Sequence, residues 1–151
     1  MIELLDEAFF GPSWHGPSLL VALRGLTDTQ AAWRPAKKRH NIWELAIHAA
    51  YWKYIARRRL TGQRERFAVK GSNWFIRPSD DRKWKEDVAL LVQEHERLRD
   101  VVIAVPETAL TQRLGDSRYT KAHLIRGIAA HDLYHAGQIQ LLKRLQSGAS
   151  E

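Results

Sequence analysis

Apolar side chains recur at alternating steps of three and four residues along three long stretches of the chain, which is the spacing of one face of an α-helix. The last stretch keeps this spacing through Leu124, Ile128, His131, His135, Gln138, Leu142 and Leu145. The earlier two follow it at Leu45, His48, Trp52 and Ile55, and at Trp84, Val88, Leu91, His95, Leu98 and Val102. Together with an earlier helix described below, the pattern predicts four long amphipathic helices, and the inward faces of these three carry histidine among apolar residues.

Residues that start and stop helices set the limits of these elements. Asn41 is predicted to cap the first of them, with Glu44 three residues later as its capping-box partner, and Gly62 to end it. Ser79 is predicted to cap the next helix and Thr120 the last one. Each long helix therefore has a recognisable beginning.

The first forty residues predict shorter helical elements. Residues 2–10 are predicted to form a short helix that Gly11 and Pro12 interrupt. Residues 17–26 are predicted to form a first main helix, with Pro17 at its first position. A capping-box spacing starting at Thr27 then predicts one short helical turn.

No segment shows the period-two alternation that would indicate a convincing β-strand. The prediction is an all-α protein, a four-helix bundle with a short extra N-terminal helix and long inter-helix loops, folded as a single domain over residues 1–151. The connection over residues 63–78 is long for a compact domain and contains Trp74, so we expect part of it to pack and to cover a site.

The composition restricts the chemistry that is available. The 151 residues include no cysteine, which excludes disulfides, thiolate ligands and a cysteine nucleophile. Residues 1–7 are acidic and lack an apolar signal core, and no apolar run reaches membrane-spanning length, so we predict a cytoplasmic protein without a membrane partner. The net charge of +7 permits an anionic ligand or nucleic acid but requires neither.

His131 and His135 are the strongest candidates for chemistry, because two inward-facing histidines one helical turn apart converge on a point where a metal ion can bind. A catalytic zinc-type site takes three protein ligands and keeps a position open. The third could be His48 or His95, and the periodicity does not choose between them. The alternative interpretation is a set of core histidines bonded to neighbouring groups.

The polar residues around this candidate site are expected to do less. Gln138 is predicted to hydrogen-bond a ligand or to specify packing, and His95 to bond a carbonyl or a carboxylate. Asp132 is one methylene shorter than the glutamate of the zinc-protease helix motif, so we expect a supporting or surface position and no protease activity. His15 and His123 are predicted to be surface or capping groups.

Cations gather where the first long helix ends, at Arg57, Arg58, Arg59, Arg64, Arg66 and Lys70. They are either a solvated helix end and loop or an anion site near the opening of the bundle. Binding of nucleic acid would require aromatic side chains between the cations, and Phe67 is the one available.

Two segments of the chain resemble the DinB/YfiT-like family, namely NIWELAIHAAYW at 41–52 and GIAAHDLYHAGQI at 127–139. The segments at 14–18 and 33–35 and Trp74 also fit, so that the resemblance runs from about Trp14 to Leu145. It implies a four-helix bundle in which three histidines bind a divalent metal, commonly nickel or zinc. By position these ligands are His48, His131 and His135, and His95 has no ligand role.

We therefore predict a divalent-metal-binding protein that acts as a metal-dependent enzyme. The resemblance implies a hydrolase or a transferase that uses a low-molecular-weight thiol, acting on a small-molecule substrate as a homodimer. One alternative is a non-catalytic metal-binding stress-response protein, whose site a fourth ligand such as His95 would close. Another, motivated by the +7 charge alone, is a nucleic-acid-binding protein, and nucleic acid is not among the partners we expect.

Overall fold

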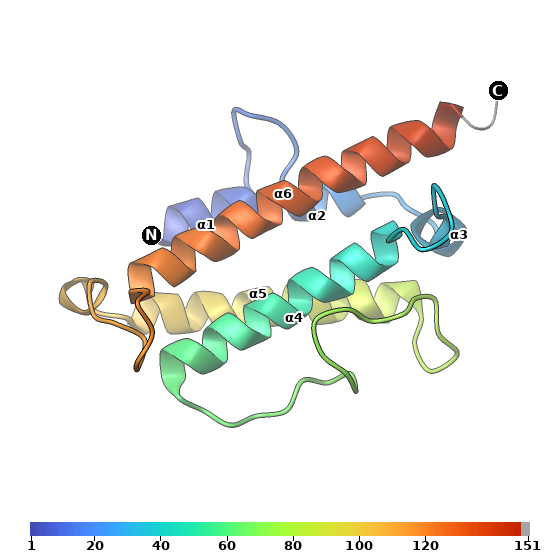
Figure 1. Ribbon diagram of the computed structural model, residues 1–151. Coiled ribbons are helices and arrows are strands. Elements are labelled where there is room, and N and C mark those ends of the chain that lie inside the picture. The colour runs from blue at the N-terminus through green and yellow to red at the C-terminus, as the bar shows by residue number, and fades with distance from the viewer. Residues whose placement is uncertain (149–151) are drawn as a thin grey trace.

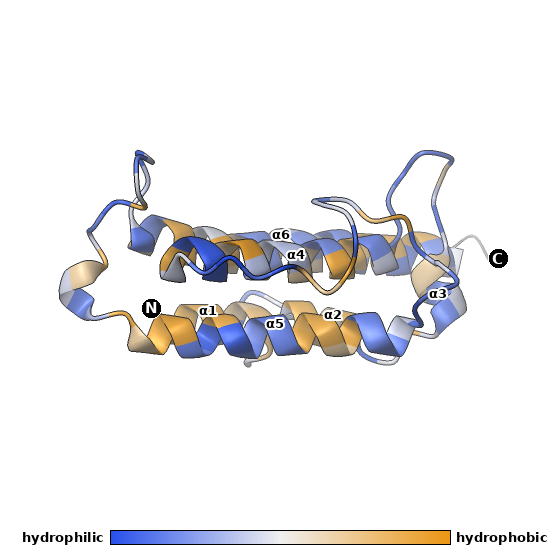
Figure 2. Cartoon of the chain, turned by 90° about the horizontal axis from the view of Figure 1, so that it is seen from below, coloured by the Kyte–Doolittle hydropathy of each residue, from blue (hydrophilic) through white to orange (hydrophobic). Residues whose placement is uncertain are grey.

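The computed structural model describes residues 1–148 and shows three long helices, which are α4 (Ile42–Thr61), α5 (Trp84–Ala104) and α6 (Lys121–Gly148) (Figure 1). No strand occurs within these residues. Two short helices, α1 (Ile2–Phe9) and α2 (Leu19–Leu23), pack against α6 and form the fourth side of the bundle. The helices make two layers, α4 with α6 and α5 with α1 and α2 (Figure 2). The predicted all-α bundle is confirmed.

The fourth side differs from the prediction because it consists of two pieces. The helix expected over 17–26 covers only the residues of α2. The N-terminal helix α1, which was predicted to be additional to the four-helix bundle, forms the other half of the fourth side. Gly16 has a φ of 133°, which a continuing helix cannot accommodate, and Gly25 turns the chain after α2 with a φ of 75°. Phe9 and Leu19 are both buried, so the two pieces contribute to the same core.

The limits of α4 follow the predicted capping signals. Asn41 Oδ1 accepts a hydrogen bond of 2.8 Å from the backbone N–H of Glu44, and Gly62 ends the helix with a φ of 74°. The side chain of Glu44 does not complete a capping box. It accepts instead from Arg34 at 2.9 Å and from the backbone N–H of Arg77 at 3.2 Å, and so joins α4 to the two segments that flank it.

The start of α5 was predicted wrongly. The helix begins at Trp84 with Lys83 as its N-terminal cap, four residues beyond the expected cap at Ser79. The reason is Asp87, a buried carboxylate in the first turn of α5 that binds Arg77 and Arg82 at 2.5 Å each. These ion pairs hold residues 77–82 against the first turn of α5, so these residues do not continue the helix towards its N-terminus. The cap of α6 was predicted correctly, since Thr120 Oγ1 accepts from the N–H of His123 at 3.2 Å.

The inward face of α6 is turned by about one residue from the predicted one. Its buried side chains are Ile125, Ile128, Ala129, Asp132, His135, Ala136, Ile139 and Leu142. His131 is half-buried at the edge of this face, and Leu145 is 47% exposed. Asp132, which we expected in a supporting or surface position, lies at the centre of the face and is fully buried. Within residues 1–148, no helix combines the length and the apolar character needed to cross a membrane.

Asp132 pairs with Lys53 of α4, which is also fully buried. The ammonium of Lys53 lies 4.7 Å from the centre of the Phe9 ring, so an aromatic face supports its charge as well. Burial raises the pKa of Asp132 to about 6 and lowers the pKa of Lys53. At pH 7 the carboxylate is still ionised, and the ion pair lies in the core between α4 and α6.

Candidate metal centre

The structure brings together three histidines from two helices, His48 of α4 and His131 and His135 of α6. His131 Nε2 lies 3.2 Å from His48 Nε2 and 3.0 Å from His135 Nε2. Helix α6 contributes two rings because residues four apart share a face, and α4 runs beside it in the opposite direction (Figure 1). His48, and not His95, is therefore the third member of the group.

Hydrogen bonds orient two of the three rings. His48 Nδ1 donates to the backbone carbonyl of Asn73 at 2.7 Å, and His135 Nδ1 donates to Gln138 Oε1 at 2.6 Å. With Nδ1 protonated in each ring, the lone pair is on Nε2, the atom that faces the other rings. Oxygen acceptors on the outer nitrogen are the usual support of metal-binding histidines. Gln138 thus hydrogen-bonds a candidate ligand, which is one of the two roles that the sequence predicted for it.

Burial keeps these imidazoles neutral. It lowers the pKa of His131 to about 3 and of His135 to about 4, and it also lowers the pKa of His48. The other two rings add to the effect at His131, because each disfavours a second positive charge nearby. Since metal ions bind the neutral ring, all three are in the binding form at pH 7.

The three nitrogen atoms fit a divalent ion. A tetrahedral ion with metal–nitrogen distances of about 2.0–2.1 Å separates its ligand atoms by roughly 3.3 Å. The two separations from His131 Nε2 are slightly shorter than that, and all three ligand atoms lie within 4.8 Å of one another. Neutral imidazoles with no carboxylate or thiolate among them suit zinc, nickel and similar metals better than calcium or magnesium. Within residues 1–148, the metal-capable group contains these three histidines and no fourth residue.

The long loop between α4 and α5 covers one side of this group, as the sequence predicted. The indole of Trp74 stacks on the ring of His48 at 3.8 Å between centroids, and its other face stacks on His40 at 3.7 Å. Asn73 has a φ of 61°, and its side chain accepts a hydrogen bond from Trp52 Nε1 at 3.0 Å. The loop is therefore attached to α4 at the point where His48 needs its acceptor.

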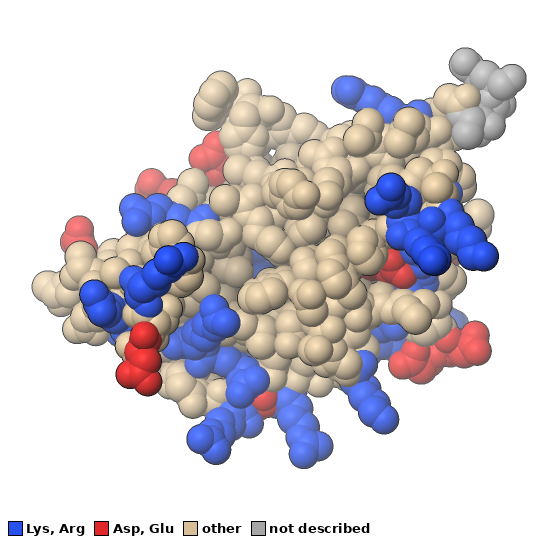
Figure 3. Space-filling model, viewed as in Figure 1, with Lys and Arg blue, Asp and Glu red and all other residues tan. Residues whose placement is uncertain are grey.

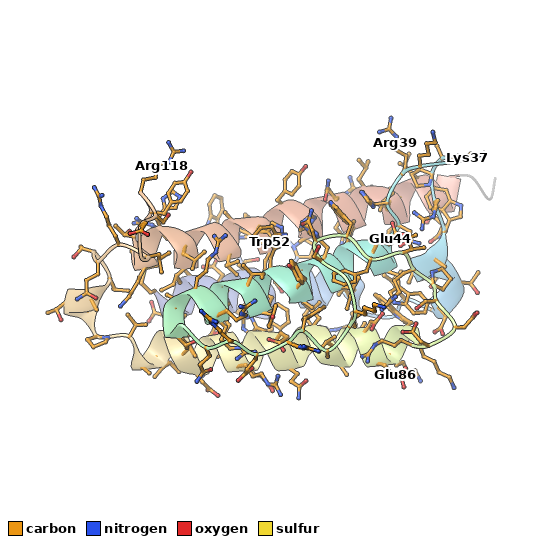
Figure 4. The ribbon with its side chains drawn as sticks, turned by 60° about the horizontal axis from the view of Figure 1, so that its bottom comes forward. Lys37, Arg39, Glu44, Trp52, Glu86 and Arg118 are labelled. Atoms are coloured by element: carbon orange, nitrogen blue, oxygen red, sulfur yellow. The ribbon has the colours of Figure 1, made fainter. Side chains whose placement is uncertain are left out.

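A cleft of about 1030 Å³ opens beside the histidines and runs between the C-terminal half of α4 and the N-terminal half of α6. His48 and His131 line it, together with Trp52, Leu124 and Ile128. Trp52 lies on the side of α4 that faces α6 (Figure 4). A ligand in the cleft can therefore contact two of the three histidines.

The other predicted residues have more varied positions. His95 is fully buried away from the group, where it stacks on Phe9 at 3.8 Å and lies 3.6 Å from an Asp6 carboxylate oxygen. His123 lines the cleft, so the surface role predicted for it was incomplete. His15 is exposed, 4.0 Å from Glu7.

Sequence reasoning missed two residues with structural roles at this site. Asn73 contributes a backbone carbonyl, which no side-chain pattern can indicate. Lys53 had a signal that was not used, because it continues a buried stripe of small residues formed by Ala46, Ala49 and Ala56. A lysine in such a stripe must be paired, which predicts an acidic partner on the facing helix.

Loss of the Gln138 acceptor is expected to weaken metal binding without abolishing it. In Gln138→Leu the ring of His135 has no partner for Nδ1–H, and we expect the dissociation constant for zinc to rise about 10–100-fold. Isothermal titration of metal-free protein with zinc measures this change. Gln140→Leu, at a half-buried position of the same helix, is the matched control, and equal affinity of the two variants would contradict the role of Gln138.

A family model described as the DinB superfamily matches residues 14–139, which is well over half of the chain. No curated protein and no solved structure matches the chain. The match includes all three histidines of the group and ends at the last residue of the second segment on which the sequence resemblance rests.

Proposed function

The chain belongs to the DinB superfamily, and from this premise we propose that it is a metal-dependent enzyme that binds one divalent ion through His48, His131 and His135. The observation that carries the proposal is the convergence of three neutral imidazoles, two of them oriented by hydrogen bonds through Nδ1, at one end of a large open cleft. Zinc and nickel are the metals that this ligand set suits.

The reaction class that we propose is the one that the family resemblance implies, and the residues of the site are compatible with it. A divalent ion supplies Lewis acidity to an oxygen or sulfur group of a substrate. The chain holds the ligand rings through Asn73 and Gln138, shields one side with Trp74, and leaves the approach from the cleft open. Hydrolysis of a small molecule or transfer of a group to a low-molecular-weight thiol are the reactions we propose.

The competing function is a metal that only stabilises the fold. Structural metal sites differ from catalytic ones in having a fourth protein ligand, which leaves no position for a substrate. His95 was the residue that could have closed this one, and it lies instead in the core against Phe9. The cleft lined by His48 and His131 favours an open site, and with it the enzyme.

The visible absorption of bound cobalt(II) shows whether the protein binds metal and whether a small ligand can reach the bound ion. We expect protein made without a histidine tag to bind one Co²⁺ per chain, with visible absorption bands that shift when acetohydroxamate is added. His123→Ala, which changes another histidine of the cleft outside the group, should keep both properties. Absence of Co²⁺ binding would contradict the metal site, and binding with no shift on acetohydroxamate would favour the structural metal.

A further inference from the structure

Arg58 and Arg59, at the C-terminal end of α4, both line the cleft that contains the histidines. Neither forms an ion pair with a carboxylate of the described residues, whereas their neighbour Arg57 is buried and pairs with Glu65 at 2.8 Å and Glu94 at 3.4 Å. Three members of the predicted cation cluster are thus distinguished: Arg57 is a structural arginine, and Arg58 and Arg59 line the cleft without a carboxylate partner, whereas Arg64, Arg66 and Lys70 do not line it. Figure 3 shows Lys and Arg side chains gathered over this end of α4.

Arg58 is held in place by neutral groups. Its Nε donates to the carbonyl of Gln63 at 3.2 Å and its Nη1 to the Tyr54 hydroxyl at 3.1 Å, while the guanidinium lies 5.5 Å from the centre of the Tyr54 ring. These contacts orient the side chain and leave its charge without a carboxylate partner. Because Tyr54 and Arg58 also line a smaller pocket on the neighbouring face of α4, Arg58 stands between that pocket and the cleft. A half-buried, oriented guanidinium without an anion is a prepared partner for a carboxylate or a phosphate.

The cleft connects these arginines to the metal-capable end. His48, Trp52 and Arg59 lie on one face of α4, and the rise of 1.5 Å per residue separates the backbone of His48 from that of Arg59 by roughly 16 Å. Leu124 and Ile128 of α6 line the cleft between its two ends. No aspartate or glutamate is among the lining residues of the described chain. The cleft is thus cationic at one end, apolar in the middle and metal-capable at the other end.

We propose that Arg58 and Arg59 form an anion subsite and that the substrate is an elongated small molecule ending in a carboxylate or a phosphate. The inference rests on the proposed function, because the opposite end of the molecule is placed at the metal. Trp52, Leu124 and Ile128 contact an apolar middle portion. The anion sets the direction in which the molecule lies, so that its reacting group reaches His48, His131 and His135.

The test uses two probes of similar length that differ at the distal end. Suberic acid monohydroxamate has a metal-binding hydroxamate and a terminal carboxylate, and octanohydroxamic acid has the same hydroxamate and a methyl end. Titration calorimetry with zinc-loaded protein gives both dissociation constants. We expect the carboxylate probe to bind about tenfold more tightly, which is the size of one charge-assisted hydrogen bond. A third probe with a terminal phosphonate shows whether a carboxylate or a phosphate is preferred.

The variants assign this preference to the two arginines. Arg59→Gln and the double variant Arg58→Gln/Arg59→Gln are expected to reduce it stepwise until the two probes bind equally. Arg64→Gln removes the same charge from an exposed position that does not line the cleft, and it should keep the full preference. Octanohydroxamic acid should bind all of these proteins equally well.

The possible failures are distinguishable. If the two probes bind the wild-type protein equally, or if the preference persists in the double variant, the anion subsite is wrong and the metal site is unaffected. If neither hydroxamate binds zinc-loaded protein, the open metal site is wrong and the subsite proposal falls with it.

Discussion

Replacement of His131 by alanine is expected to weaken zinc or nickel binding by about a hundredfold to a thousandfold. His131 Nε2 is the central atom of the group, within 3.2 Å of both other Nε2 atoms, so its removal leaves two rings without their common neighbour. Closed zinc sites bind with about 10–16 kcal/mol through four ligands, so that one ligand accounts for roughly 2.5–4 kcal/mol, or about a hundredfold to a thousandfold in affinity. Competition titration against a chromophoric chelator measures affinities in this range.

Two controls separate the loss of a ligand from a general effect of losing a histidine. His123→Ala removes a ring that lines the same cleft, and His95→Leu removes a buried ring outside the group. Both are expected to bind metal with the wild-type affinity once they are shown to be folded by circular dichroism. Equal metal affinity of His131→Ala and wild-type protein would remove the basis of the proposed function.

Replacement of Asp132 by alanine is expected to lower the free energy of unfolding by about 3–5 kcal/mol, because it leaves the ammonium of Lys53 in the core without its partner. Both side chains are fully buried, so the ammonium has no contact with bulk solvent that could replace the carboxylate. Urea denaturation at pH 7 measures the loss. Chelator should be present in every sample, because Asp132 neighbours His131 in sequence and bound metal would otherwise contribute to stability.

A double variant distinguishes the loss of charge compensation from the loss of packing. Lys53→Met/Asp132→Leu replaces both charges with apolar groups of similar size and is expected to recover most of the lost stability, since such exchanges are often neutral or stabilising. If Asp132→Ala lost less than about 1 kcal/mol, the ion pair would not be the buried contact that the structure shows. A double variant as unstable as the single one would mean that the packing around these positions matters more than the charges.

Local signals in the sequence were sufficient for much of the fold. Asn41 and Gly62 were identified as the ends of α4, and Thr120 as the cap of α6, because capping depends on residues within one helical turn. The start of α5 was wrong because Asp87 binds Arg77 and Arg82, which lie outside the helix. No pattern within the helix records these ion pairs.

The candidate site was also predictable where it depends on residues close together in the chain, and not where it depends on contacts between helices. The spacing of His131 and His135 predicts two converging rings, since their separation on the helix is set by its pitch. Periodicity alone did not distinguish His48 from His95 as the third histidine of the site, and the family resemblance was needed to choose His48. In the structure His48 faces α6, whereas His95 packs on Phe9 in the core.

The sequence by itself determined the helical class, most helix ends and the histidine pair, because these depend on side chains close together along the chain. Only the tertiary structure decided the rotation of α6, and with it the burial of Asp132 against Lys53, because apolar periodicity leaves the helix orientation uncertain by about one residue. It also decided that a carbonyl of the 63–83 loop supports His48 and that Arg58 and Arg59 share a cleft with the histidines. Contacts between distant segments follow from how whole helices pack, and no local pattern records that packing.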